Sequence, residues 1–209
     1  MRSSGISVRN VYPMNETEIQ TSIQKSAKIA DIALKIGKIL IVLTTLLLIA
    51  AVAFTPFIYG VEGPAGFSQW VVEEDLMSTF GPGVVVPAGV DPAAAFMQAS
   101  VVFLASALAS LVLLAGMIWP AATIFAEIRK TGLPFTRFNG QQLKKVAIFM
   151  GLIAFVPSVI EAVGSIIIQI PLNTAYLSIE MLLAAAIVYG IAHVFEYGTL
   201  LQQQADETL

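Results

Sequence analysis

The chain has 209 residues, of which 57% are apolar and only 12% are charged, with a net charge of −3 and a mean hydropathy of +0.83. Soluble domains carry about 25% charged residues, so this chain has too few charges to solvate a globular surface and is expected to lie in a lipid bilayer. The negative charge excludes a basic footprint for nucleic acid. Because there is no cysteine and only one histidine, His193, disulfides, cysteine-bound metals and multi-histidine metal sites are excluded.

Four stretches are apolar and long enough to cross a bilayer, which takes about 20 residues of helix. They predict an all-α fold, a membrane four-helix bundle in residues 39–209, preceded by a separate segment, residues 1–38. The predicted spans cover approximately residues 39–60, 99–122, 146–169 and 174–195. The uncharged stretch around the second span is longer than one crossing requires, so this helix is expected to extend beyond the membrane on the cytoplasmic side.

The basic residues predict the orientation of the spans. All 11 lysines and arginines lie in residues 1–38 and 127–145, whereas the loop 62–91, of about 30 residues, carries only acidic charges. Four crossings place the two basic segments on the same side of the membrane, and basic segments face the cytoplasm. Both termini are therefore expected in the cytoplasm, with the loop outside. Within that loop, Val84–Val86 could form a short strand.

The first 38 residues leave two alternatives open. Residues 15–35 are expected to be helical, with Asn15 as the cap and Glu18 as its reciprocal partner. We favour a simple lead-in to the first span over a helix that binds a partner or the membrane surface. Ala51-Val52-Ala53 resembles a signal-peptidase site, but the preceding basic region is far longer than that of a signal peptide, so we expect the first span to be retained.

Two carboxylates and a histidine lie within the last two spans: Glu161, Glu180 and His193. An acidic residue inside a span costs about 2.5–3.5 kcal/mol, so it is expected to face protein or water. If Glu161 and Glu180 met across an antiparallel hairpin, one of them would be protonated and the pair could respond to protons or cations. We favour two unrelated carboxylates, each bonded to a nearby polar group, and a histidine that simply hydrogen-bonds its neighbours.

Two short motifs lie next to the predicted spans. The first contains Gly132, Pro134, Phe135, Asn139, Lys144 and Lys145, and the second contains Phe195, Gly198, Leu201, Gln202, Asp206 and Thr208. From about residue 100 to 209, they resemble a family of bacterial four-span membrane proteins of unknown function. The resemblance implies a bacterial cytoplasmic membrane. Because some members are encoded beside a very small helix-turn-helix regulator, it also implies a membrane partner for a transcription factor.

The sequence has no nucleophile–base constellation, phosphate loop or metal-ligand spacing, so we predict neither an enzyme nor a cofactor. Our first hypothesis is a signalling or regulatory protein that binds a small cytoplasmic partner where the basic loop 127–145 meets the acidic tail 194–209. The candidate binding residues are Arg129, Lys130, Pro134, Phe135, Asn139, Lys144 and Lys145. The alternatives are a proton- or cation-linked transporter or channel component and an accessory subunit of a larger membrane complex. Small residues in the second span would also allow a homo-oligomer.

Overall fold

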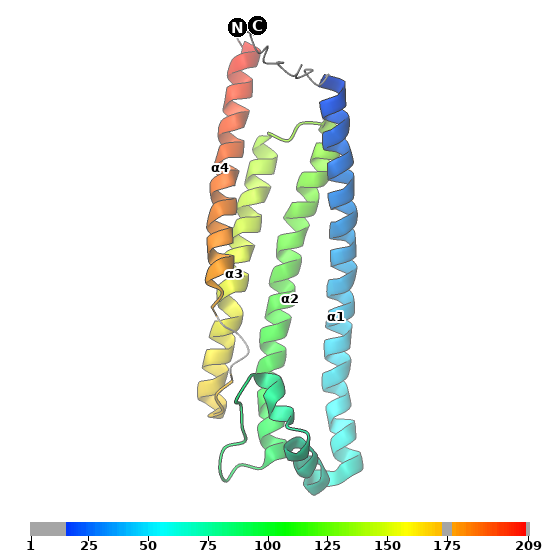
Figure 1. Ribbon diagram of the computed structural model, residues 1–209, viewed down its shortest axis with the longest axis vertical. Helices are drawn as coiled ribbons and strands as arrows, with labels where there is room; N and C mark the ends of the chain where they lie inside the picture. The colour runs from blue at the N-terminus through cyan, green and yellow to red at the C-terminus, as the bar shows by residue number, and fades with distance from the viewer. Residues whose placement is uncertain (1–15, 173–176, 208–209) are drawn as a thin grey trace, which may run out of the picture.

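The computed structural model describes residues 16–172 and 177–207 (Figure 1). Its elements are four long helices and one short 3-10 helix: α1 (Glu16–Glu73), η1 (Leu76–Phe80), α2 (Pro92–Thr131), α3 (Arg137–Ile168) and α4 (Ile179–Glu207). The described residues include no strand, so the predicted all-α class is confirmed. Each of the four long helices is long and apolar enough to cross a membrane, as expected of a membrane protein.

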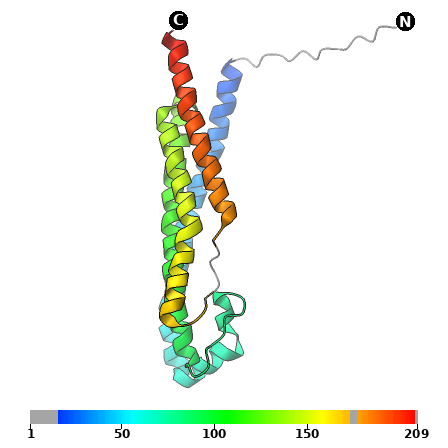
Figure 2. The ribbon, with the colours of Figure 1, turned by 90° about the vertical axis from the view of Figure 1, so that its left-hand side faces the viewer.

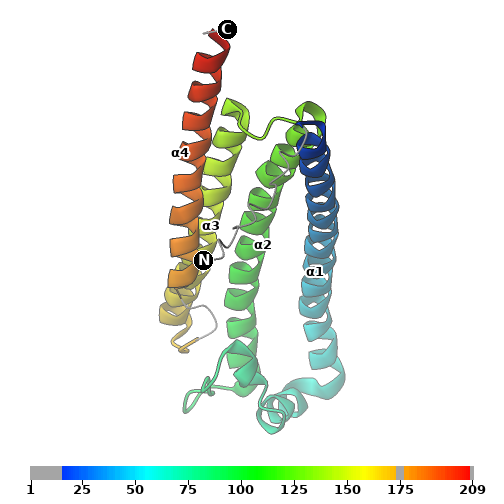
Figure 3. The ribbon, with the colours of Figure 1, turned by 45° about the horizontal axis from the view of Figure 1, so that its top comes forward.

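The four long helices stand side by side in a row, with α1 and α4 at its two edges (Figures 1 and 3). In the described structure α1 packs on α2, α2 on α3 and α3 on α4, and no contact joins α1 to α3 or α4. The predicted bundle is therefore an open row and not a closed ring. The start of α1, the α2–α3 connection and the end of α4 share one end of the row, which we call the terminal end. Segment 62–91 forms the opposite loop end.

Helix α1 continues without interruption from Glu16 into the first apolar stretch, which agrees with a helical lead-in to the first span. The predicted cap, Asn15, lies outside the described residues. Near the terminal end, Ala27 is buried against Ile124 and Ile128 of α2. Closer to the predicted membrane boundary, the Lys38 ammonium lies 4.9 Å from the Trp119 ring centroid. These contacts fasten the lead-in helix to α2, so this face serves packing within the chain.

The loop end contains helical segments and a buried apolar cluster of its own. At Gly63 the backbone leaves the helical conformation (φ 70°, ψ 171°), which glycine adopts readily, and the chain turns before helical structure resumes as far as Glu73. This segment and η1 cover the start of α2 with an apolar cluster built from Phe67, Val71, Met77, Phe80, Val84, Ala93, Ala95, Ala99 and Ile170. The short strand predicted at Val84–Val86 is absent, because the described chain offers no neighbouring strand to pair with it.

Helix α2 begins at Pro92, seven residues earlier than the predicted span. Its N-cap is Asp91, whose carboxylate accepts a hydrogen bond from the Ala94 amide at 3.0 Å. The Ser68 hydroxyl donates to the same carboxylate at 2.6 Å and ties the loop end to the helix. At the other end, α2 stops at Gly132, where φ is 70° and the amide donates to the Ile128 carbonyl at 2.8 Å. The second helix therefore extends beyond its predicted span, as expected, and it stops at a left-handed glycine.

Helix α4 begins partway along α3 (Figures 1 and 2). Its first residue is Ile179, five residues after the predicted start of the fourth span, and residues 173–176 lie outside the described chain. Helix α3 begins at Arg137, nine residues before the predicted third span, and is capped by Thr136. The terminal end therefore consists of helices that run well beyond the apolar stretches, and this is where the candidate site lies.

Candidate functional site

The two sequence motifs meet at the terminal end. The Phe135 ring, in the α2–α3 connection, lies 5.0 Å from the Phe195 ring of α4, measured between ring centroids. A Cβ atom at Gly198 would lie 3.1 Å from the Phe135 ring, so the glycine allows that ring to approach α4. The α2–α3 connection is thus anchored on α4 by aromatic packing. We call the surface formed by residues 132–145 and 194–207 the terminal platform.

Asn139 shapes the start of α3. Its side chain is fully buried, and its amide nitrogen donates to the Pro134 carbonyl at 3.0 Å. Its backbone amide donates to the Thr136 hydroxyl at 3.1 Å, which completes the helix cap. The side-chain oxygen of Asn139 has no hydrogen-bond partner in the described structure. Asn139 and Pro134 therefore fix the connection that presents Phe135 to α4, which is a structural role for two predicted binding residues.

An ion pair joins α3 to α4 beside the aromatic contact. Lys144 Nζ lies 2.8 Å from both carboxylate oxygens of Glu196, and His193 Nδ1 lies 3.5 Å from Oε2 of the same carboxylate. The hydrogen bond from Lys144 lowers the pKa of Glu196 most, and the charges of Lys144, His193 and Arg137 lower it further. The predicted attraction between the basic connection and the acidic tail is confirmed for this pair.

Arg129 lies outside the terminal platform. Its Nη1 is 2.7 Å from the buried carboxylate of Asp31 in α1, which also pairs with Lys35 at 3.0 Å. The sequence assigned Arg129 to a surface facing the acidic tail, and this assignment does not match the geometry. Arg129 is in the last turn of α2, so its side chain turns toward α1, the neighbour of α2 on that side. Lys130 and Lys145 are exposed and form no ion pair with the described residues.

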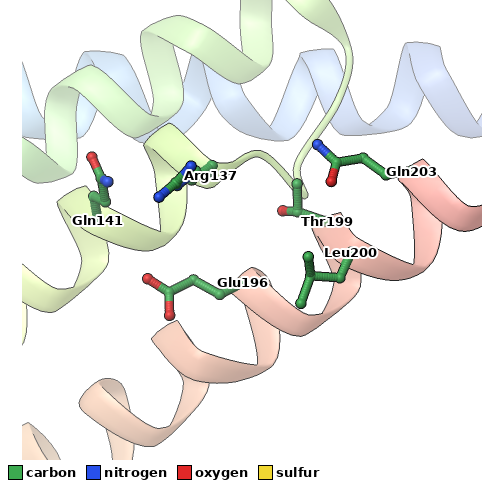
Figure 4. Close-up of a pocket in the computed structure, with 6 residues that line it drawn as sticks. All are labelled: Arg137, Gln141, Glu196, Thr199, Leu200 and Gln203. Carbon is green, nitrogen blue, oxygen red and sulfur yellow. The ribbon is translucent and has the colours of Figure 1, made fainter.

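A hollow of about 380 Å³ lies between the first turns of α3 and the last turns of α4 (Figure 4). It is lined by Arg137, Gln141, Glu196, Thr199, Leu200 and Gln203. All six lie in the loop 127–145 and the tail 194–209, from which the sequence predicted a binding surface, but none of them is among the candidate binding residues. The lining comes from two helices about 60 residues apart in the chain, and no local spacing links them. The periodicity of each helix was the one available signal, and it does not say which helices are adjacent.

The two intramembrane carboxylates have different surroundings. Glu161 of α3 is buried, and the Ser106 hydroxyl of α2 donates to its Oε1 at 2.9 Å. Glu180 is exposed in the first turn of α4, where the Ser178 hydroxyl donates to it at 3.2 Å. Each carboxylate thus accepts a hydrogen bond from a serine, as our favoured interpretation expected. Glu161 serves as a polar contact between α2 and α3, where small residues bring the helices close together.

In the described part of the chain, no group of three or more His, Asp or Glu side chains could hold a metal ion. Comparison with models of known protein families, with curated proteins and with solved structures finds no match to this chain. The terminal platform must therefore be interpreted from its own chemistry.

Proposed function

We propose that the chain is a regulatory protein of the bacterial cytoplasmic membrane that binds a small soluble protein on its terminal platform. The platform faces the cytoplasm, as the positions of the basic residues predict. The partner is a helix-turn-helix regulator, as the family resemblance of residues 100–209 implies. The chain provides the membrane anchor and the binding surface, and it has no catalytic role.

One observation carries the proposal. Two segments far apart in the chain pack together into a single surface at the terminal end, although crossing the bilayer does not require such packing. Phe135, in the connection between α2 and α3, packs on Phe195 and against Gly198, at the point where α4 leaves the predicted fourth span. Large apolar side chains remain exposed beside this contact: Phe138 is 43% exposed, Tyr197 62% and Leu200 56%. Apolar groups clustered on a water-facing surface are typical of a protein-binding site.

Copurification tests this function. The tagged chain is coexpressed with the soluble protein encoded by the neighbouring gene, and the amount of recovered partner is measured for each variant. We expect Phe135→Ala, and truncation after Tyr197, to lower recovery at least roughly tenfold, as loss of an aromatic anchor at an interface does. The matched control is Phe155→Ala, which removes an exposed phenylalanine of α3 inside the predicted span.

Size-exclusion chromatography in detergent shows whether each variant is folded before its partner recovery is compared. Undiminished recovery with both folded platform variants would contradict the proposed function. An equal loss with Phe155→Ala would also contradict it, because partner binding would then not depend on the platform.

A transporter or channel component is the second candidate, since Glu161 is buried between two predicted spans. An open row of four helices encloses no pathway in one copy, so transport would require several copies. The exposed faces of the row would equally suit an accessory subunit of a larger complex. Both alternatives have less support than the platform, because neither explains the ordered contacts at the terminal end.

A further inference from the structure

The α3–α4 hollow has unused hydrogen-bonding capacity. The side chains of Arg137, Gln141 and Gln203 line it, yet none of them forms a hydrogen bond or ion pair with the described part of the chain. The Thr199 hydroxyl donates to the Phe195 carbonyl at 3.0 Å, so its oxygen can still accept. Arginine is exclusively a donor with a planar fork of N–H groups. A ligand for this hollow must therefore present acceptor atoms.

The charge balance of the hollow also favours an anion. Its one lining carboxylate, Glu196, is already paired with Lys144 at 2.8 Å. With these two charges neutralised, the guanidinium of Arg137 supplies the remaining charge of the lining. Glu207, one helical turn beyond Gln203, is not among the lining residues. A carboxylate fits this arrangement best, because an arginine fork binds its two oxygens with two parallel hydrogen bonds.

The distance of the hollow from the membrane indicates that its ligand is a soluble molecule and not a lipid. Arg137 precedes the third span, which begins at Val146, by nine residues, or about 13 Å of helix. Gln203 follows the last residue of the fourth span, Phe195, by eight residues, or about 12 Å. The headgroup layer on each side of a bilayer is only about 5–7 Å thick. Both residues thus lie beyond the lipid phosphates.

We infer that the α3–α4 hollow binds a side-chain carboxylate, Asp or Glu, of a soluble protein partner, with Arg137 as its main contact. The inference rests on the proposed function for the orientation of the platform, and it specifies the chemistry by which the partner is recognised. Gln141 and Gln203 supplement the arginine fork with amide donors, and Leu200 contacts the methylene groups of the incoming side chain. The partner is therefore expected to present an acidic helix or loop to the platform.

Peptide binding to the full chain in neutral phosphatidylcholine nanodiscs tests the inference. The probes are two labelled, amide-capped, alanine-rich helical peptides that differ only in one central residue, Glu or Gln, and fluorescence anisotropy measures their affinity. We expect the wild-type chain to bind the Glu peptide about tenfold more tightly than the Gln peptide, because hydrogen bonds to a charged group are roughly twice as strong as neutral ones. Arg137→Gln should abolish the preference. Lys28→Gln removes the same charge from an exposed position of α1, outside the hollow, and should retain the preference.

Equal binding of the two peptides by the wild-type chain, or a preference that survives Arg137→Gln, would overturn the inference. Glu-peptide binding that disappears when the nanodisc contains phosphatidylglycerol would identify a lipid phosphate as the occupant and would overturn it too. The two proposals can fail separately. Partner recovery that depends on Phe135, combined with equal binding of the two peptides, contradicts only the carboxylate site inferred for the hollow. A preference for the Glu peptide that depends on Arg137, without any partner recovery, supports the carboxylate site in the hollow and contradicts only the proposed function.

Discussion

Asp31 adds an ion pair to the contacts that hold α1 against α2 at the terminal end. Its carboxylate is 2.7 Å from Arg129 Nη1 and 3.0 Å from Lys35 Nζ. The hydrogen bond from Lys35 lowers its pKa most, and the charges of Lys35 and Arg129 lower it further below the ordinary value of 3.8. A carboxylate with a lowered folded-state pKa stabilises the fold above its ordinary pKa, and this contribution disappears as the pH falls through the folded-state pKa.

Asp31→Asn should therefore lower the thermal midpoint of the detergent-solubilised protein at pH 7 and flatten its decline below about pH 4. The measurement is a series of thermal melts from pH 7 to pH 3. Glu74→Gln, an exposed carboxylate at the loop end, is the matched control and should follow the wild-type profile. The role given to Asp31 is wrong if both variants have the same pH profile.

At Glu161, the hydrogen bond from Ser106 predicts that an acceptor matters more than a charge. Glu161→Gln keeps an oxygen for the serine and should leave the free energy of unfolding within about 1 kcal/mol of wild type. Glu161→Ala removes the acceptor and leaves space between α2 and α3, so we expect a loss of roughly 1–3 kcal/mol. Equal losses in the two variants, measured by denaturation in mixed micelles, would show that the charge itself is required.

At the level of the helices, both ends of α2 are set by local features of the backbone. Helix α2 stops at Gly132, where a glycine in the left-handed conformation ends the helix. The start of α2 was predicted too late, because the estimate relied on the length of a membrane crossing and not on the cap at Asp91 followed by Pro92. Hydropathy identifies the part of a helix that lies in lipid, but the helix itself can extend beyond that part.

The sequence did not predict which faces of the helices pack against each other. Periodicity places Phe195 and Gly198 near each other on α4, but it does not reveal that Phe135 meets them. An attraction between the basic loop and the acidic tail was predicted from opposite charges, but neither the pairing of Lys144 with Glu196 nor that of Arg129 with Asp31 was predicted. Long-range charge balance indicates which segments can approach, and the rotation of each helix decides which side chains touch.

Close packing of α2 on α3 gives a test at this scale. A Cβ atom at Gly164 would lie 2.3 Å from Val102 of α2, whereas one at Gly151, on the same helix, would meet nothing within 4 Å. Gly164→Ala should destabilise the fold by about 1–3 kcal/mol, as overpacking does. Gly151→Ala should be neutral or stabilising by up to about 1 kcal/mol, since alanine favours helix. Thermal melts in detergent distinguish the two, and equal effects would contradict this packing.

For the whole molecule, composition could not predict that the four long helices form an open row. Four apolar spans suggest a closed bundle, but in lipid no hydrophobic force draws helices into a ring, since hydrocarbon is as apolar as the side chains. Contacts between neighbours then decide the arrangement, and α1 contacts α2 but neither α3 nor α4 in the described structure. The larger of the two buried apolar clusters in the described structure lies at the loop end, where the chain folds over the start of α2.

The orientation of the row underlies every proposal made for the terminal platform. The chain contains no cysteine, so single-cysteine variants give an unambiguous labelling signal. Glu74→Cys places a thiol at the loop end and Gln202→Cys places one at the terminal end, both at exposed positions. In spheroplasts treated with a membrane-impermeant maleimide, we predict that Glu74→Cys reacts at once and Gln202→Cys reacts only after lysis. Labelling of Gln202→Cys in intact spheroplasts would contradict a four-span protein whose terminal platform faces the cytoplasm.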